Sequence, residues 1–475
     1  MKEKLKTFLL FSLVSISILI TQKLWMKLPT DFLKTITEDR PVVSTSYAIS
    51  DMIAPNKYLL NFDQENHTLV YDDSKYGLWS ASKTNLKQMF ESKTVEFKDI
   101  SYEDYIDFEN DKSVIFYFPE EISSYILAKA WNIKKANDIV DTIPSISSIY
   151  IYLGKGEPFF VLTGMDKRII IRDVNIDTEL LKAEINIIES EKEYPNYYSM
   201  RERLDTDNDT YVLFKTNNLL PKVTVTNEIA IMDETQKNNL AKRFFNKEIG
   251  FIREIVEANG STIYIYDQKV LKLNSNGTLE YFHGLEEPVK ERNFYQSLSA
   301  AADFISQKTG VQKGMYLSKS EEIEIDGNDG YRLSFKYRVR GIPVILGNLQ
   351  VDEYIQLDVF KDHIRNYKQY VRKDMSLTPN TAIENRPMLT SYDILDLNSE
   401  TLKNRYLMNN SFEQGMEEAA QIKTVLNSIK DITLAYYDPC LKDKEERLIG
   451  VWAIRLQDRI LAFDAYTGSL VYEDN

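Results

Sequence analysis

Two short motifs in this sequence contain the residue types that penicillin-recognising enzymes use. Ser80-Ala81-Ser82-Lys83 fits their Ser-x-x-Lys pattern, and Lys308-Thr309-Gly310 fits their Lys-Thr-Gly pattern. The chemistry needs Lys83 one helical turn from Ser80, where its amine can take the hydroxyl proton. The third element of these enzymes, Ser-x-Asn, is absent between the two motifs, and Gly310 stands where a glycine ends a helix at C′. We therefore interpret the matches as ordinary helix and helix-end sequence.

Histidine and cysteine, the usual zinc ligands and nucleophiles, are scarce. His67, His283 and His363 are the only histidines, and they lie far apart without a His-x-x-x-His or His-Glu-x-x-His motif. Zinc sites usually need clustered ligands, so we interpret all three as surface or turn histidines. The single cysteine, Cys440, follows Asp438-Pro439 in an expected turn and has no basic neighbour on its N-terminal side to activate the thiol.

Two further patterns match ligand-binding loops only in part. Asp205, Asp207 and Asp209 are spaced like the first ligands of an EF-hand, but threonines occupy its glycine and final glutamate positions, so we expect a solvated acidic turn. Gly154-Lys155-Gly156 lacks the third glycine of a dinucleotide loop, and its flanks indicate a hairpin. The sequence thus predicts no catalytic, metal-binding or cofactor-binding residue and no cofactor. It leaves open whether two carboxylates face each other across a cleft at glycosidase distance.

The first 28 residues have the pattern of a membrane anchor. Basic residues at positions 2, 4 and 6 precede the uncharged run Thr7–Gln22. An apolar helix of about 20 residues spans a bilayer core, and residues 7–26 reach that length if Lys23 extends its charged end outward. Bulky residues occupy the place of a small-residue cleavage site, which favours an uncleaved anchor over a cleaved signal peptide.

Three side chains are the expected anchors at the two membrane interfaces, namely Lys6, Lys23 and Trp25. The N-terminal tail is very short and the following segments soon become acidic. We therefore expect a single-pass protein of the cell membrane, with its N-terminus in the cytoplasm and its body on the extracytoplasmic side.

The anchor carries hydroxyl side chains on two faces. At 100° per residue, Thr7, Ser17 and Thr21 fall within an arc of about 80°, and Ser12 and Ser15 lie roughly opposite. Such residues let transmembrane helices approach closely and hydrogen-bond to each other. These five are therefore candidate contacts to transmembrane partners. The alternative is that each hydroxyl bonds back to a carbonyl of its own helix.

Composition limits the classes of function. The chain has 475 residues, enough for about three domains, and a net charge of −14. An acidic protein lacks the basic footprint that nucleic acid requires, so no nucleic-acid partner is expected. A single cysteine allows no intrachain disulfide, which suits the outside of a bacterium that makes few disulfides. Abundant Tyr, Ile, Val and Phe with little Gly favour sheets with helices packed on them.

Periodicity predicts the elements of the N-terminal half of the body. We expect strands at 58–62, 68–71, 113–118, 149–153, 159–162 and 168–172, and helices at 78–90, 119–131 and 177–189. Pro119 suits the first position of the second helix. Leu180, Leu181, Ile185 and Ile188 should form the buried side of the third.

The C-terminal half begins after a connector at 219–227. A helix at 234–245 precedes strands at 252–256, 262–267, 269–273 and 279–282, which are separated by turns such as Asn259-Gly260 and Asn276-Gly277. Two later segments resemble each other. The first has a helix at 296–308 and strands at 331–340, 349–359 and 363–371, and the second has a helix at 412–428 and strands at 432–437, 447–456 and 460–463. We interpret them as an internal repeat in which a helix precedes an antiparallel meander.

The predicted fold class is therefore α+β, with an N-terminal transmembrane helix and a body of several small domains in which helices pack on one face of antiparallel sheets. The expected parts are a cytoplasmic tail and anchor (1–28), a stalk (29–55), a membrane-proximal α+β region of one or two subdomains (56–218), an α+β domain with a helix and meander (219–380) and a C-terminal α+β unit (381–475).

With this layout the chain resembles the YycH family, the membrane-anchored regulators of the cell-wall two-component system of low-GC Gram-positive bacteria. Segments 113–122, 331–337 and 341–344 carry the resemblance together with the anchor. The last segment, from Val451-Trp452-Ala453-Ile454 to Phe463–Gly468, resembles the strand pair of PepSY-type domains.

The resemblance implies a non-enzymatic regulator of cell-wall homeostasis. It implies two partners, the sensor histidine kinase YycG (WalK) and a YycI-like membrane protein, with the anchor helix contacting the kinase's transmembrane helices. One alternative is an anchored cell-wall hydrolase or penicillin-recognising enzyme, which predicts a deep cleft with converged carboxylates, or Ser80 beside Lys83 and Lys308. The other is a PepSY-type inhibitory module, which predicts an exposed sheet edge or groove that binds peptide.

Overall fold

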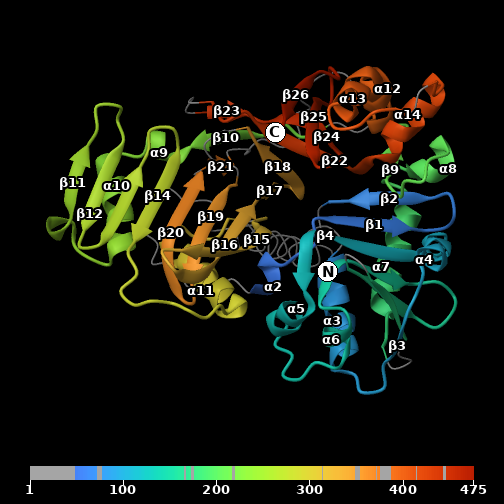
Figure 1. Ribbon diagram of the computed structural model, residues 1–475, viewed down its shortest axis with the longest axis horizontal. Helices are drawn as coiled ribbons and strands as arrows, with labels where there is room; N and C mark the ends of the chain where they lie inside the picture. The colour runs from blue at the N-terminus through green and yellow to red at the C-terminus, as the bar shows by residue number, and fades with distance from the viewer. Residues whose placement is uncertain are drawn as a thin grey trace, which may run out of the picture. The chain divides into compact units, whose positions relative to one another are not determined.

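The computed structural model combines helices with antiparallel sheets (Figure 1). It describes residues 49–71, 77–164, 167–172, 176–216, 220–312, 314–347, 353–370, 372–374, 387–412, 415–441 and 445–474. All of them belong to one compact unit, Ser46–Asn475. The expected anchor, its interface residues and its five hydroxyl residues lie outside the described residues. Among the helices that are described, none combines the length and the apolar character needed to cross a membrane.

The first half of the body forms a nine-stranded antiparallel sheet in the order β3-β7-β6-β5-β4-β1-β2-β8-β9. Its strands are β1 Lys57–Asn61, β2 His67–Val70, β3 Glu96–Asp99, β4 Ser113–Ser123, β5 Ser145–Tyr152, β6 Phe159–Thr163, β7 Arg168–Arg172, β8 Tyr197–Ser199 and β9 Tyr211–Leu213. The accompanying helices are α2 Ile49–Met52, α3 Leu78–Glu91, α4 Tyr102–Glu109, α5 Ser124–Ala130, α6 Ile139–Thr142, α7 Glu179–Glu191 and α8 Met200–Leu204.

Both faces of this sheet are buried. On one face, Val114 and Phe116 of β4 share a core with Leu86 of α3 and Leu181 of α7. On the other face, alternate residues of the same strands join a second core, to which α4 and the C-terminal strands also contribute; examples are Leu59, Tyr105, Ile115, Val161, Ile170, Ile432 and Trp452. The central strands are therefore almost continuously apolar, as expected of strands covered on both sides.

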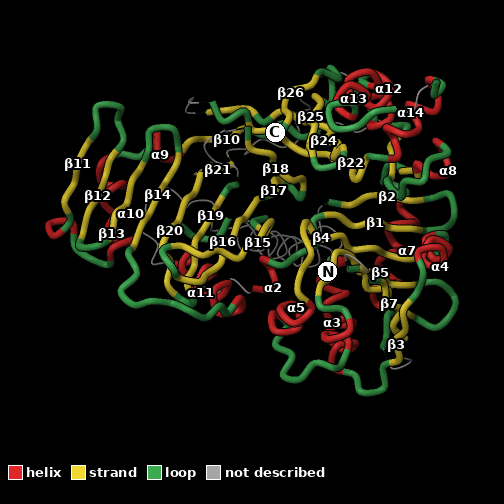
Figure 2. The backbone as a smooth tube through the Cα atoms, in the orientation of Figure 1, coloured by secondary structure: helices red, strands yellow, loops and turns green. Residues whose placement is uncertain are grey.

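The second sheet has eight antiparallel strands in the order β11-β12-β13-β14-β20-β19-β16-β15 (Figure 2). They are β11 Arg253–Val256, β12 Thr262–Tyr266, β13 Lys269–Leu273, β14 Thr278–His283, β15 Tyr316–Ile325, β16 Asn328–Lys336, β19 Ile355–Phe360 and β20 His363–Tyr370. Two helices, α10 Glu234–Phe245 and α11 Phe294–Lys308, cover one face. Phe244 and Leu298 of these helices pack against Tyr281 and Leu357 of the strands. The short helices α9 (Glu228–Ile231) and η2 (Ile249–Phe251) flank α10.

Two smaller sheets complete the body. A three-stranded sheet combines β21 Arg372–Asp374, β10 Thr224–Asn227 and β23 Glu445–Arg447. A six-stranded sheet contains, in order, β17 Arg338–Val339, β18 Ile342–Leu346, β22 Ile429–Asp438, β24 Ile449–Leu456, β25 Arg459–Asp464 and β26 Leu470–Glu473. The helices α12 Ser391–Leu397, α13 Ser399–Tyr406 and α14 Glu418–Asn427 pack on the six-stranded sheet (Figure 2). Because β18 pairs in parallel with β22, residues 342–346 join a sheet that is otherwise built from residues 429–473, apart from the short β17 hairpin strand.

Local sequence explains where several elements begin and end. Asp233 forms a capping box with Gln236 at the start of α10, which satisfies two orphan backbone donors. Gly260 and Gly277 adopt positive φ angles, +87° and +94°, in the turns after Asn259 and Asn276, and both flanking strand pairs form hairpins as predicted. The helix-then-meander order predicted for the two later segments is also confirmed, with α11 preceding β15, β16, β19 and β20 and α14 preceding β22, β24, β25 and β26.

The helix predicted from Pro119 is wrong at its start. β4 continues through this proline to Ser123, and the helix α5 begins only at Ser124. The pairing of β4 with β5 shifts register between Tyr117 and Ile122, so the proline lies in a bulge. A bulge leaves residues outside the hydrogen-bond ladder, where proline's missing N–H costs nothing.

Other boundaries also differ from prediction. The expected connector at 219–227 contains β10, which hydrogen-bonds to two strands. Leu180 is 67% exposed, because Leu181, Ile185 and Ile188 form the buried stripe and Leu180 lies one helical step away from it. β19 begins at Ile355 and α14 at Glu418, later than expected. The strands β15 and β18 and the helices α12 and α13 were not predicted.

Candidate interaction surface

The residues of the two enzyme-like motifs lie on helices that cover different sheets. Ser80 and Lys83 are on α3 of the nine-stranded sheet. Lys308 ends α11 on the eight-stranded sheet, where its Nζ donates to the carbonyl of Arg243 at 2.6 Å. Gly310 has φ +80° and its N–H donates to the carbonyl of Ile305, so it ends the helix as predicted. The structure does not bring the two motifs together as one site.

The histidines are not all the surface or turn residues that the sequence suggested. His67 is buried, and its Nδ1 lies 2.8 Å from Oδ1 of Asn61. His283 and His363 meet on neighbouring strands with ring centroids 4.4 Å apart, and Nε2 of His363 lies 3.1 Å from the carbonyl oxygen of His283. Desolvation, together with the nearby His363, lowers the pKa of His283 to about 4. The described residues hold no group of three His, Cys, Asp or Glu side chains placed to bind a metal.

Cys440 lies in a turn, is half-buried and is a poor nucleophile. Burial raises the pKa of its thiol to about 12, and the neighbouring Asp438 adds to the shift. The thiol also donates to the carbonyl of Asp438 at 3.3 Å. A thiolate is the reactive form of cysteine, so this environment keeps the group unreactive.

The acidic loop is also more than a solvated turn. Asp205 pairs with Lys423 of α14 at 2.9 Å, and Asp209 pairs with Arg201 of α8. The Gly154-Lys155-Gly156 segment joins β5 to β6 in a hairpin, as predicted. The tip of the Tyr152 ring occupies the space where a Cβ at position 154 would lie, so a side chain there would require this ring to move.

The structure instead presents an open face on the eight-stranded sheet, opposite α10 and α11. Residues directly opposite on neighbouring antiparallel strands share a face, so the pairings define two rows across it. The first row contains Ile255, Ile263, Lys272, Glu280, Lys368, Gln356, Ser334 and Lys319. The second contains Arg253, Ile265, Val270, Phe282, Asn366, Asp358, Arg332 and Glu321. We call these two rows the open face.

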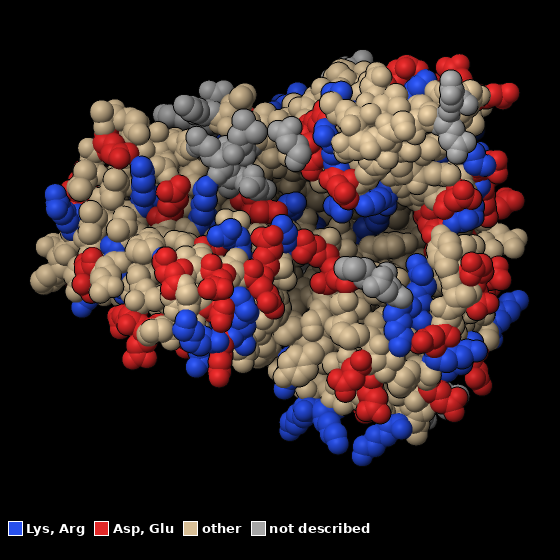
Figure 3. All heavy atoms as spheres, in the orientation of Figure 1, with Lys and Arg blue, Asp and Glu red and all other residues tan. Residues whose placement is uncertain are grey.

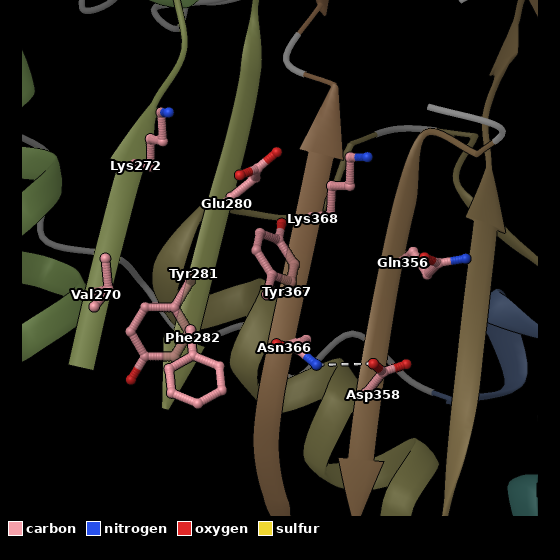
Figure 4. A pocket seen from close by; sticks show the side chains of 10 residues that line it. All are labelled: Val270, Lys272, Glu280, Tyr281, Phe282, Gln356, Asp358, Asn366, Tyr367 and Lys368. Carbon is pink, nitrogen blue, oxygen red and sulfur yellow. Dashed lines mark hydrogen bonds between the residues drawn. The ribbon is translucent and has the colours of Figure 1, made fainter. Parts of the chain in front are cut away.

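The middle of the open face is hollowed. A shallow depression of about 360 Å³ lies over β13, β14, β20 and β19. Figure 4 shows its lining side chains on neighbouring strands, with Glu280 between Lys272 and Lys368 and with helices behind the sheet. Acidic and basic side chains are mixed over this part of the molecule in Figure 3. A depression of this size is within the range of ligand sites, but its open form suits a macromolecular partner better than an enclosed small molecule.

Charges on the open face alternate along the first row. Lys272, Glu280 and Lys368 are directly opposite one another on β13, β14 and β20. Lys272 Nζ is 3.3 Å from a carboxylate oxygen of Glu257. Such partly solvated pairs contribute little to stability, typically below about 1 kcal/mol. Their charges can therefore be used for recognition at little cost to the fold.

Several side chains of the second row are held in place by hydrogen bonds to each other. Arg332 binds both carboxylate oxygens of Asp358, at 2.7 and 3.1 Å, and Asn366 Nδ2 donates to the same carboxylate at 2.9 Å. These bonds hold the floor of the depression in place. Next to them the ring of Phe282 is 39% exposed, beside the partly exposed Val270.

Together these features make the open face a candidate interaction surface, with a hydrogen-bonded polar floor, alternating charges and one exposed aromatic ring. Exposed aromatic rings are enriched at protein–protein interfaces. The sequence predicts β13 and β14 but not this surface, because its rows form only when strands that lie up to about 100 residues apart in the chain pair with each other. The alternation of polar and apolar residues in Lys269–Leu273 and Leu279–Phe282 was the available signal for a half-exposed sheet.

Comparison with known proteins identifies the fold. No protein-family model and no curated protein matches the chain. Among solved structures, YycH from Bacillus subtilis matches with a TM-score of 0.52 and 14% identity, covering 87% of this chain and 96% of that chain. An uncharacterised protein from Eubacterium rectale covers 56% of this chain and 92% of its own at 13% identity (TM-score 0.36), and the C-terminal domain of YpeB from Bacillus megaterium covers 51% and 97% at 13% identity (TM-score 0.25). The first of these shows that the chain has the fold of YycH, as the resemblance predicted.

Proposed function

We propose that this protein is a membrane-anchored regulator that works by binding other proteins, as the YycH resemblance implies. Its partners would be a sensor histidine kinase of the YycG (WalK) type and a YycI-like single-pass membrane protein. The observation that supports this most strongly is the likeness to YycH over 87% of the chain and 96% of YycH. In this proposal the body is extracytoplasmic and the N-terminal helix holds it at the membrane.

Regulation by binding needs only a modest energy difference. If the partner complex favours one arrangement of the kinase helices by ~1–3 kcal/mol, kinase activity changes several-fold or more. The protein then requires no reaction of its own. It requires one contact in the membrane and one contact outside it.

The outer contact is assigned here to the open face, with the ectodomain of the YycI-like protein as its occupant. Charge complementarity between the open face and the partner supports this assignment. Three neighbouring strands present side chains of alternating charge, namely Lys272, Glu280 and Lys368, and these are separated by the spacing between adjacent strands. A partner surface with the opposite alternation would place an opposite charge against each member of the row, whereas a shifted partner would meet like charges, which cost several kcal/mol.

Crosslinking in native membranes tests the function. A photoreactive residue at Gln356 in the open face and another at exposed Gln88 on α3 would be compared in the full chain. We expect the first position to capture a second single-pass protein, the second position to capture neither partner, and the kinase to co-purify with the complex. Recovery of neither a sensor kinase nor a second anchored protein would contradict the proposal.

Exchanging the charges of Glu280 and Lys368 provides a second test of the open face. The double variant Glu280→Lys with Lys368→Glu keeps the net charge and reverses two members of the row. We expect partner affinity to fall at least about tenfold, which corresponds to about 1.4 kcal/mol. The matched control exchanges Lys242 and Glu248, an exposed pair outside the open face that is 2.7 Å apart, and should leave affinity unchanged.

The membrane contact is assigned to the hydroxyl faces of the anchor. Replacing Ser17 and Thr21 by leucine keeps the segment apolar and removes the hydrogen-bonding groups. We expect the kinase to be lost from membrane co-purification while the chain stays in the membrane. Unchanged recovery would remove this assignment and leave the open face as the remaining contact.

A further inference from the structure

The strand β11 forms one end of the eight-stranded sheet and has an unpaired edge. It is the first strand in the sheet order, and Figure 1 shows it at the outer end of this sheet. Just after β11, the backbone N–H of Glu257 donates to the carbonyl of Ser261 at 2.8 Å. Because the direction of the backbone groups alternates along an antiparallel strand, Glu254 and Val256 direct their N–H and C=O groups away from the sheet. Within the part of the chain that the structure describes, no strand pairs with this edge.

The edge of β11 is less protected against pairing than the opposite edge of the same sheet. There β15 has a bulge between Leu317 and Lys319 and three glutamates, features that discourage association. At β11, Phe251 and Val256 are 74% and 68% exposed, the highest values among the large apolar side chains of the described residues. An unpaired edge with exposed apolar side chains is a template for pairing with another chain.

A second copy of β11 fits this edge. Two copies of one strand pair in antiparallel fashion around a two-fold axis perpendicular to the sheet, so both copies keep the same face on the same side. With the axis at Ile255, Glu254 of each copy lies opposite Val256 of the other. These are the two residues whose backbone groups point outward, and each such pair can exchange both of its N–H···O bonds.

The neighbouring registers fit less well. An axis at Glu254 would place two glutamates opposite each other. It would also require the N–H of Ile252, which already donates to the carbonyl of Ile249 at 2.9 Å. An axis at Val256 would carry the pairing into the turn that follows the strand. The axis at Ile255 avoids these conflicts.

Charges on the open face are complementary in the same register. Arg253 of each copy lies directly opposite Glu257 of the other, and the symmetry forms this pair twice. Glu257 belongs to the same face, since its carboxylate lies 3.3 Å from Nζ of Lys272. Between the two charge pairs, the half-exposed Ile255 meets Ile255 of the other copy. The edge is therefore complementary to itself in backbone hydrogen bonds, in charge and in apolar contact.

We propose that this protein forms a homodimer through β11, in which two eight-stranded sheets join into one continuous sheet. The two open faces then lie on the same side of the joined sheet. The contact is small, so we expect it to form mainly where chains are concentrated, as the proposed membrane anchor would concentrate them. The dimer does not depend on which partner occupies the open face.

Disulfide trapping of the full chain in membranes tests the dimer. In a Cys440→Ser background, Ile255→Cys places a cysteine at the two-fold axis. The two Cα atoms of such a pair are about 4.5 Å apart, which a disulfide can span, and we expect oxidation to give a linked dimer. The matched control is Ile263→Cys, on the same face but one strand further in. Its two copies would lie about 14 Å apart, and we expect no linked dimer.

Charge reversal tests the register. In the Ile255→Cys chain, Arg253→Glu places a carboxylate opposite Glu257 of the other copy. We expect the initial rate of crosslinking to fall at least about threefold, since the like-charge pair occurs twice. The control is Lys98→Glu, at an exposed position on the edge strand β3 of the other sheet, and it should leave the rate unchanged.

Three results would overturn the proposal. They are the absence of a linked dimer for Ile255→Cys, equal crosslinking at positions 255 and 263, and an unchanged rate in Arg253→Glu. If Ile255→Cys does not fold, the double variant Arg253→Cys with Glu257→Cys replaces it. These positions are about 13 Å apart within one strand but directly opposite between copies, so a disulfide forms only in the dimer, and its absence would contradict the proposal.

Discussion

The nine-stranded and eight-stranded sheets differ in how many faces they bury. In the first, strands such as β6 and β7 have consecutive buried residues, and both faces contact other elements. In the second, β13 and β20 alternate between buried and half-exposed residues, and α10 and α11 cover one face. An antiparallel sheet can leave one face solvated at no cost to its core. The first sheet therefore serves as a scaffold, and the second has side chains available for a partner.

The largest predicted effect concerns the scaffold. Phe116 is fully buried, with ring centroids 5.3 Å from Tyr58 and 5.2 Å from Trp79. Phe116→Ala would leave a cavity beside the rings of Tyr58 and Trp79, and we expect the free energy of unfolding to fall by about 3–5 kcal/mol. Urea unfolding measures the change. A loss below about 1 kcal/mol would show that this sheet is not the packed scaffold described here.

The second prediction concerns the three-stranded sheet of β21, β10 and β23. Arg372 of β21 is fully buried between Asp438, with Nε 3.2 Å from Oδ2, and Glu446 of β23. Arg372→Ala leaves two buried carboxylates without their cation, and we expect a loss of about 3 kcal/mol in unfolding free energy. Arg253→Ala, at an exposed strand position, is the control and should change it by less than about 0.5 kcal/mol.

The third prediction is a pH dependence in the eight-stranded sheet. Because the folded-state pKa of His283 is about 4 and that of an exposed histidine is 6.5, the unfolded chain binds a proton first as the pH falls. Its contribution to stability is therefore complete above 6.5 and is lost as the pH falls from 6.5 to 4. We expect His283→Gln to reduce the slope of unfolding free energy against pH in this window. His363→Gln, which removes one cause of the shift, should reduce it less; an unchanged slope in both variants would contradict the assignment.

The smallest predicted change in unfolding free energy concerns the open face of the eight-stranded sheet. Phe282 lies on the open face and is 39% exposed. Phe282→Ala should lower the free energy of unfolding by less than about 1 kcal/mol, since much of the ring is already in water. The same variant should weaken partner binding if the open face is the interface. A stability loss equal to that of Phe116→Ala would mean that the two sheets do not differ as described.

Local patterns in the sequence predicted much of the secondary structure. The helix at 234–245 and the strand at 168–172 were predicted with the observed bounds, because a capping box and short apolar runs act over a few residues. Pro119 misled the prediction, since its tolerated position depends on a bulge against β5. β15 was missed because its exposed residues are all polar or charged and its apolar alternation is weak.

The open face and the other long-range contacts were harder to predict than the secondary structure. The likeness to the YycH fold was readable from the residue types and the order of the elements alone. The open face was not, because Lys272, Glu280 and Lys368 become neighbours only when three strands pair. The pairing of His283 with His363 and the binding of the acidic loop to α14 also join residues that are distant in the chain.

The sequence by itself determined many of the helices and hairpins, the acidic charge and the N-terminal apolar segment, because these depend on composition and on neighbours within a few positions. The tertiary structure alone decided the strand order, the parallel pairing of β18 with β22 and the choice of which sheet face stays open. The physical reason is that burial is a property of the packed molecule. A strand with alternating residues can face a helix or a partner, and only the elements that pack around it decide which.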